Sequence, residues 1–156
     1  MTEIRAATVD VYVLRRRGSA WQLLLLQRAS GTRSTGAWEV VHGHVDGDER
    51  PEEAALRELA EETGLPAERL YSVIVQPFYL HALGTGTITL AAVFAAVVAP
   101  GAQPTLSAEH QRAEWLAFDP AMARVSWPRS RDAIVHIEML LRGGDAGVLE
   151  KTLRVR

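Results

Sequence analysis

The feature that most constrains the fold is a set of short apolar runs, separated by turn residues, on both sides of one acidic helical segment. Residues 6–14 (AATVDVYVL) are rich in β-branched side chains and predict a buried strand. Residues 21–27 (WQLLLLQ) are short and bounded by turn residues, which favours a second strand over a helix. Further extended segments are predicted at residues 38–41, 71–81, 87–99 and 114–118.

Two segments are predicted to be helical. Residues 51–63 begin with a proline, which suits a first helical turn, and Gly64 follows in the usual position of a left-handed cap. Residues 128–142 form an amphipathic pattern, and a polar tail follows them. Strands before and after a first helix, with a second helix near the end, predict an α/β fold in which a sheet lies between helices.

Composition excludes several classes of protein and site. The 156 residues are 47% hydrophobic and 23% charged, so we expect one globular domain over residues 1–156. The absence of cysteine excludes disulfides, thiolate metal sites and cysteine nucleophiles. A net charge of −2 gives no general electrostatic reason to bind nucleic acid, and no apolar run reaches the length of a membrane span. We therefore expect a cytoplasmic protein, monomeric or homodimeric, with no membrane partner and no stable nucleic-acid partner.

Negative charge is concentrated in residues 46–62, which carry eight of the 19 acidic residues and no lysine. Like charges this close repel one another, and an ordinary solvated helix intersperses lysines among them. The segment therefore predicts a bound cation.

A helical wheel separates the side chains of this segment into two faces. One predicted face is apolar and directed toward the sheet: Leu56, Leu59, Ala60 and Thr63. The opposite face carries Glu58, Glu61 and Glu62 at i, i+3 and i+4 spacing. Clustered carboxylate oxygens are hard ligands that suit Mg²⁺ or Mn²⁺ better than zinc.

The spacing of residues around this helix resembles a known signature. Gly43 is followed after five residues by Glu49, and after seven more by residues 57–65 (RELAEETGL). Residues 43–65 thus match every fixed position of the Nudix box. The resemblance to the Nudix hydrolase family implies an α/β/α sandwich with a central mixed sheet.

The resemblance also implies roles for individual box residues. The implied ligands of Mg²⁺ or Mn²⁺ are the carboxylates of Glu58, Glu61 and Glu62 and the backbone carbonyl of His42. The implied structural residues are Gly43 and Gly64, through their backbone conformation, and Arg57, through an ion pair with Glu49 or Glu61.

The chemistry implied by the family is attack of water at phosphorus in a compound that contains a nucleoside diphosphate. A carboxylate-rich site can receive an anionic polyphosphate only with metal ions between them. Two residues are candidates for the general base: Glu58 inside the box, and Glu109 on the loop before a later strand, where it is otherwise a metal ligand. Glu114 is the alternative if that loop has a different register.

Residues 107–134 resemble the dihydroneopterin triphosphate and dATP pyrophosphohydrolase branch, with an acid–histidine pair and a Ser-Trp before the last helix. This implies a small-molecule nucleoside or pterin triphosphate as substrate, with Arg28 at a phosphate and Trp38 or Trp127 beside the base. Diadenosine polyphosphates and nucleotide sugars are alternative substrates. A Nudix module that senses a nucleotide without cutting it is a further alternative, although such modules usually lack box glutamates that this chain retains.

Overall fold

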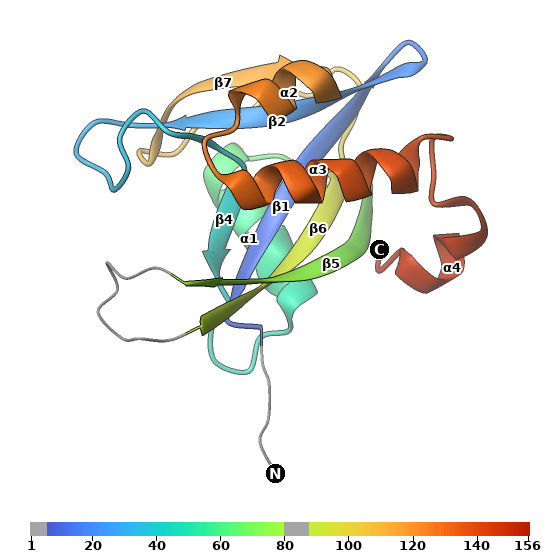
Figure 1. The fold of residues 1–156 in the computed structure, drawn as a ribbon, viewed down its shortest axis with the longest axis horizontal. Coiled ribbons are helices and arrows are strands. Elements are labelled where there is room, and N and C mark those ends of the chain that lie inside the picture. Colours follow the sequence, from blue (N-terminus) through green and yellow to red (C-terminus); the bar gives the residue numbers. More distant parts are fainter. Residues whose placement is uncertain (1–5, 80–87) are drawn as a thin grey trace.

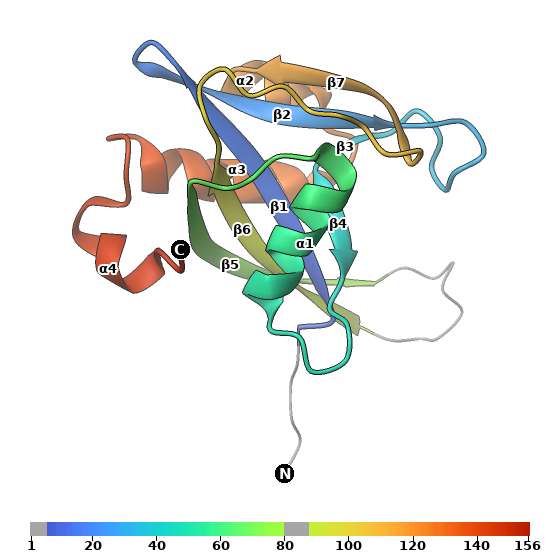
Figure 2. The ribbon, with the colours of Figure 1, turned by 180° about the vertical axis from the view of Figure 1, so that it is seen from behind.

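The protein is a mixed sheet covered on each face by a helix. The computed structural model describes residues 6–79 and 88–156. Helix α3 (Pro128–Leu141) crosses the sheet in the view of Figure 1, and helix α1 (Pro51–Thr63) crosses it from the other side in Figure 2. The predicted α/β/α sandwich is therefore confirmed.

The sheet has seven strands. They are β1 (Thr8–Arg17), β2 (Ala20–Arg28), β3 (Trp38–Glu39), β4 (Val41–His44), β5 (Arg69–Tyr79), β6 (Ile88–Val97) and β7 (His110–Leu116). Their order is β3-β2-β1-β6-β5, with β4 paired to β1 and β7 paired to β2. The pairing of β1 with β6 is parallel and the other pairings are antiparallel, so the sheet is mixed.

Strand β1 organises the sheet because it has two successive partners along one edge. Thr8–Val11 pair with β4, and Leu14–Arg17 pair with β2. The opposite edge of β1 pairs with β6. Strands β2 and β4 therefore separate from each other along β1, and residues 39–42 lie where these two parts of the sheet diverge.

Two apolar layers hold the helices against the sheet. One lies between the sheet and α3 and includes Tyr12, Trp38 and Ile134. The other lies between the sheet and α1 and includes Val11, Ala55 and Leu59. Burial of these apolar side chains contributes most of the free energy that holds α1 against the sheet, and it thereby positions the glutamates of α1.

The predicted elements differ from the observed ones mainly near the C-terminus. Strand β7 begins at His110, four residues before the predicted start at Glu114. Two short helices, α2 (Phe118–Arg124) and α4 (Glu150–Leu153), were not predicted. Neither begins with a side-chain cap, and both are too short to show the helical repeat of apolar residues. The turn predicted at residues 83–86 lies outside the described residues. No helix in the described part of the chain is long and apolar enough to cross a membrane.

Candidate active site

The three glutamates of α1 lie in three different environments. Glu62 is 3% exposed, Glu58 is partly buried and Glu61 is exposed. The predicted division of α1 into an apolar and an acidic face is thus wrong in two places: Glu62 lies on the buried face, and Ala60 is exposed. Burial of the small side chains Ala54 and Ala55 turns the helix relative to the predicted stripe, and this carries Glu62 toward the sheet.

Gly43 lets Glu58 approach the sheet. A Cβ atom added to Gly43 would lie 2.0 Å from Cδ of Glu58 and 2.1 Å from its Oε1. No side chain fits this position while Glu58 keeps its place. At the other end of α1, Gly64 has φ of 68° and its N–H donates to Ala60, which ends the helix as predicted.

Arg57 joins the loop before α1 to the helix. Its Nε and Nη2 donate to Glu49 at 2.9 and 3.0 Å, Nη1 donates to Glu58 at 2.8 Å, and Nη2 also donates to the carbonyl of His44 at 2.9 Å. A longer contact of 3.5 Å reaches Glu61. Hydrogen bonds from Arg57 lower the pKa of Glu49, whereas burial raises the pKa of Glu58 despite its bond to Arg57. Arg57 therefore contacts both of its predicted partners.

Glu62 is a buried carboxylate that pairs with no lysine or arginine among the described residues. Its Oε2 has no hydrogen-bond partner among the described residues. Burial, together with the charges of Glu109, Glu58 and Glu39, raises its pKa to about 9. The backbone of His42 lies beside it. This position requires either a proton or a bound cation.

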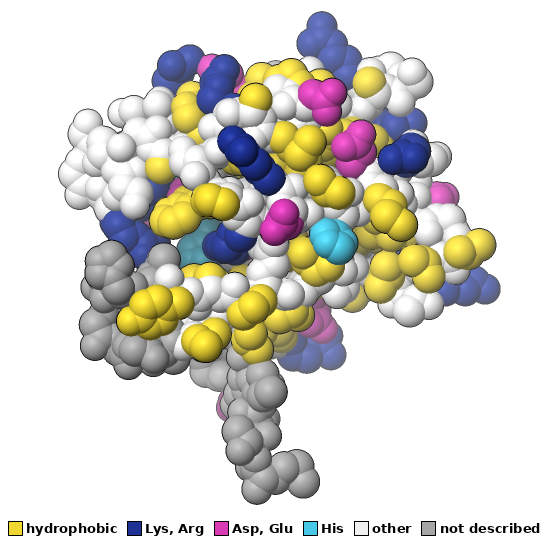
Figure 3. Space-filling model, in the orientation of Figure 1, with side chains coloured by type: hydrophobic (Ala, Val, Ile, Leu, Met, Phe, Trp, Pro, Cys, Tyr) yellow, Lys and Arg dark blue, Asp and Glu magenta, His cyan; other side chains and the backbone are white. Residues whose placement is uncertain are grey.

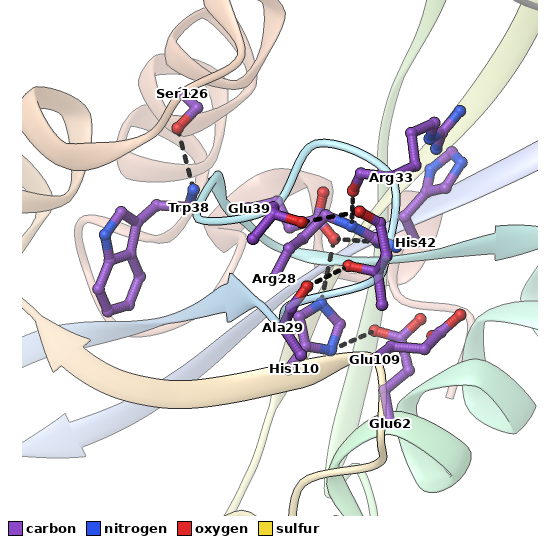
Figure 4. Close-up of polar contacts among 12 residues, drawn as sticks. Arg28, Ala29, Arg33, Trp38, Glu39, His42, Glu62, Glu109, His110 and Ser126 are labelled. Atoms are coloured by element: carbon purple, nitrogen blue, oxygen red, sulfur yellow. Dashed lines mark hydrogen bonds and ion pairs between the residues drawn. The ribbon is translucent and has the colours of Figure 1, made fainter.

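His110, at the start of β7, lies between two carboxylates (Figure 4). Its Nε2 is 3.0 Å from Oε1 of Glu39, and its Nδ1, which has no hydrogen-bond partner among the described residues, is 3.9 Å from Oε2 of Glu62. Glu39 also accepts hydrogen bonds from Arg28 at 2.9 Å and from Trp127 at 3.4 Å. Sequence reasoning did not assign a role to His110, although it noted the Glu109–His110 pair.

Glu109 completes a group of potential metal ligands. Its side chain is exposed, and its backbone carbonyl accepts from the N–H of Ala29, which holds the loop against the end of β2. Ligand atoms of Glu62, Glu109 and His110 lie within 4.8 Å of one another. We call these three residues the ligand cluster. An anionic cluster with unpartnered buried atoms fits a divalent cation.

A second buried carboxylate, Asp10 on β1, lies nearby in a different setting. Oδ1 of Asp10 is 2.6 Å from Nδ1 of His42, and Arg129 of α3 forms an ion pair with Asp10. Burial alone would raise the pKa of Asp10, but the bond to His42 and the charge of Arg129 outweigh it and lower that pKa. The guanidinium of Arg129 also lies 4.6 Å from the ring centre of Phe78.

Two neighbouring cavities lie at this site. The acidic cleft is lined by residues that include Arg28, Gly43, Glu58 and Glu109. The aromatic pocket, of about 230 Å³, is lined by residues that include Asp10, Tyr79, Trp127 and Arg129. The two cavities share Arg33, His42 and Phe78. Figure 3 shows histidine and basic side chains recessed at the left of the face that carries α3.

The remaining predicted site residues are placed as follows. Arg28 lines the acidic cleft but is already paired with Glu39. Trp38 packs in the apolar layer under α3, its ring lies near Arg112 and Arg124, and it lines neither cavity (Figure 4). Between the two tryptophans suggested as a base platform, the structure thus brings Trp127, and not Trp38, to a cavity.

Glu114, the alternative base, does not lie at the cleft. It is on β7 and pairs with Arg112 and Arg124 at 2.8 and 2.9 Å. Glu109, in contrast, lines the cleft.

Comparison with known proteins gives the family. A NUDIX domain model matches residues 4–137. The chain is 33% identical over 132 residues to an octanoyltransferase of Myxococcus xanthus, a match that covers 81% of this chain and 35% of that protein. It is 56% identical over 41 residues to an RNA pyrophosphohydrolase of Cereibacter sphaeroides, covering 26% of this chain and 25% of the relative. The chain thus spans little more than a third of the first of these curated relatives and a quarter of the second.

Solved structures agree on the fold. A Caenorhabditis elegans Ap4A hydrolase has a TM-score of 0.75 at 21% identity, covering 89% of this chain and 99% of that one. The dihydroneopterin triphosphate pyrophosphohydrolase of Escherichia coli has a TM-score of 0.67 at 22% identity, covering 90% of this chain and 97% of that one. With the family model matching most of its length and the Nudix box in place on α1, the chain belongs to the NUDIX domain family.

Proposed function

We propose that this protein, acting as one domain over residues 1–156, hydrolyses a phosphoanhydride bond in a nucleoside or pterin triphosphate with Mg²⁺ or Mn²⁺. The observation that carries the proposal is the junction of the acidic cleft with the aromatic pocket. One cavity offers carboxylates for metal ions, and the other offers aromatic rings for a flat heterocycle. A compound that carries both a polyphosphate and a heterocycle would extend across the residues that the two cavities share.

The residues that would hold the metal are Glu58, Glu62 and Glu109, with Glu61 and the carbonyl of His42 at the margin. Glu62 carries the strongest support, because its buried Oε2 is unpartnered among the described residues. When bound, a divalent ion neutralises phosphate charge and acts as a Lewis acid for the attack of water at phosphorus.

Glu58 and Glu109 are the candidates for the base that removes a proton from the attacking water. Burial raises the pKa of Glu58, which makes its carboxylate a stronger base, but Arg57 donates to one of its oxygens at 2.8 Å. The side chain of Glu109 is exposed at the cleft.

The aromatic pocket supports a heterocyclic group at the other end of the substrate. Trp127 and Phe78 supply ring faces, and Arg129, which stacks on Phe78, is held by Asp10. At the shared boundary, Arg33 lies on the exposed loop and can contact a phosphate.

A hydrolysis screen tests this proposal. Purified protein with Mn²⁺ or Mg²⁺ is offered deoxynucleoside triphosphates, dihydroneopterin triphosphate, dinucleoside polyphosphates, nucleotide sugars and 5′-triphosphate RNA, with phosphate release measured after pyrophosphatase coupling. We expect the highest kcat/KM among the mononucleoside and pterin triphosphates. Preference for another class would contradict the substrate proposal, and no turnover of any class would favour a sensing module.

Variants of the two candidate bases separate their roles. The pH dependence of kcat/KM is compared for the wild type, Glu58→Gln and Glu109→Gln. The variant that lacks the base loses the acidic limb of the profile, whereas loss of a metal ligand alone shifts the metal concentration required for activity. If both variants keep the acidic limb, neither carboxylate is the base.

A further inference from the structure

The position of His110 is not explained by packing alone. Its side chain is 1% exposed, it is the first residue of β7, and one ring nitrogen is held by Glu39 at 3.0 Å. The other ring nitrogen, Nδ1, has no hydrogen-bond partner among the described residues. A buried polar atom without a partner destabilises the folded protein, so its retention calls for a ligand.

We infer that Nδ1 of His110 is a ligand of the divalent ion, beside the carboxylates of Glu62 and Glu109. This inference rests on the proposed metal-dependent function and deepens it, because it adds a nitrogen donor to a site that the box residues make from oxygen alone. The ligand cluster thus combines one residue from α1, one from the loop and one from β7.

The separation between His110 and Glu62 fits two ligands of one ion. Nδ1 of His110 and Oε2 of Glu62 are 3.9 Å apart, which is too far for a hydrogen bond. Metal–ligand bonds of about 2.1 Å allow two ligands of one ion to lie up to roughly 4.2 Å apart. Both atoms are buried and unpartnered among the described residues, and they face each other (Figure 4).

Glu39 orients the imidazole for this role. Ligating histidines commonly donate their second ring N–H to a carboxylate, which fixes the tautomer and leaves the other nitrogen free for the metal. Glu39 fulfils this condition, since Arg28 and Trp127 hold its two oxygens.

A nitrogen ligand changes which ions the site prefers. Transition-metal ions accept an imidazole ligand more readily than Mg²⁺, which favours oxygen ligands, and Mn²⁺ is the first member of that transition-metal series. We therefore expect this site to discriminate for Mn²⁺ over Mg²⁺ more strongly than its carboxylates alone would.

Electron spin-echo spectroscopy of Mn²⁺ added to the metal-free protein tests the inference directly. Protein labelled with ¹⁵N only in histidine should show ¹⁵N coupling to the bound Mn²⁺. This readout needs no substrate and no turnover, and it needs no variant. Mn²⁺ that binds without histidine coupling would overturn the inference and leave the hydrolase proposal standing, whereas failure to bind Mn²⁺ at all would contradict both.

Two substitutions then assign the nitrogen. His110→Gln keeps an amide near Nε2 that can contact Glu39 but removes the atom at Nδ1. His110→Asn keeps a polar atom near Nδ1. The control is His136→Gln, because His136 is exposed on α3.

We expect His110→Gln to lose the coupling and to weaken Mn²⁺ binding by about 10–100-fold with a smaller effect on Mg²⁺. His110→Asn should recover part of the Mn²⁺ affinity, and His136→Gln should match the wild type. A structural role, in which a protonated His110 bridges Glu39 and Glu62, predicts equal losses for both ions and no coupling in the wild type. That result would overturn the inference.

Discussion

Asp10 and Glu62 are both buried carboxylates, 1% and 3% exposed, but their environments are opposite. Asp10 contacts His42 at 2.6 Å and pairs with Arg129, and its pKa is lowered. Glu62 lies among the carboxylates of Glu109, Glu58 and Glu39, and burial together with their charges raises its pKa to about 9.

The difference shows which region needs a ligand. The protein itself supplies the positive charge for Asp10, so the wall of the aromatic pocket is electrostatically complete. The charge of Glu62 is balanced only when a proton or a cation arrives. Side chains of the protein therefore balance the charge of Asp10 at the pocket wall, whereas the charge of Glu62 is balanced from solution.

The largest effect is expected for Glu62→Gln, which removes a charge that the metal requires. We expect kcat to fall by about 10²-fold or more, the range seen when one preorganised electrostatic contact is lost. The fold should persist, because the glutamine is neutral, as protonated Glu62 is. Steady-state kinetics and circular dichroism check both points, and a near wild-type rate would show that Glu62 is not part of the catalytic site.

Asp10→Asn should act on stability. The substitution leaves Arg129 and His42 without their anionic partner, and we expect a loss of about 3 kcal/mol in the free energy of unfolding, typical of a broken buried pair. Urea unfolding of the metal-free protein measures it, with exposed Asp132→Asn as the control. If Asp10→Asn is no more damaging than Glu62→Gln under these conditions, the contrast between the two carboxylates is wrong.

The stability of the metal-free protein should depend on pH through Glu62. Its pKa is about 9 in the folded protein, against 4.5 as the ordinary value. Between these values the folded state binds more protons than the unfolded state, so the free energy of unfolding falls as pH rises, by at most about 1.4 kcal/mol per unit. The contribution of Asp10 depends on pH in the opposite direction. Because its pKa is lowered in the folded protein, Asp10 stabilises the fold at pH values above its ordinary pKa, and this stabilisation is lost as the pH falls.

Thermal unfolding in a chelator between pH 5 and 9 measures this dependence. We expect Tm to decrease with pH in the wild type and to do so less in Glu62→Gln. If Tm falls equally with pH in the two proteins, the assignment of this pH dependence to Glu62 is wrong.

Gly43→Ala should have a smaller effect on stability than Asp10→Asn. The new methyl group would occupy the place of the Glu58 carboxyl group, so Glu58 must move. We expect a loss of about 1–3 kcal/mol in stability, as for other overpacked sites, together with weaker metal binding. An unchanged metal affinity would show that the position of Glu58 is unimportant for metal binding.

The box helix could be predicted from sequence because its determinants are local. Pro51, Gly64 and the periodic side chains between them fix its ends and its type. The rotation of the helix about its own axis was harder to predict, because alanines give only a weak apolar signal. Ala54 and Ala55 were not recognised as buried, and so Glu62 was placed on the wrong face.

The rest of the site depends on pairings far apart in sequence. Glu109 and His110 reach Glu62 because β7 pairs with β2, with His110 opposite Arg28. No local pattern specifies that register. The choice between Trp38 and Trp127 depended in the same way on which face of the sheet each ring would meet, and the structure brings Trp127 to the pocket.

Calorimetric titration of the metal-free protein with Mn²⁺ at pH 7.5, repeated in buffers that differ in ionisation enthalpy, tests most directly whether the unpaired charge of Glu62 exists to receive a cation. We predict saturable binding with release of about one proton per protein, since Glu62 must give up its proton to bind the ion, and no such release from Glu62→Gln. Absence of binding, with or without a nucleotide present, would contradict the account.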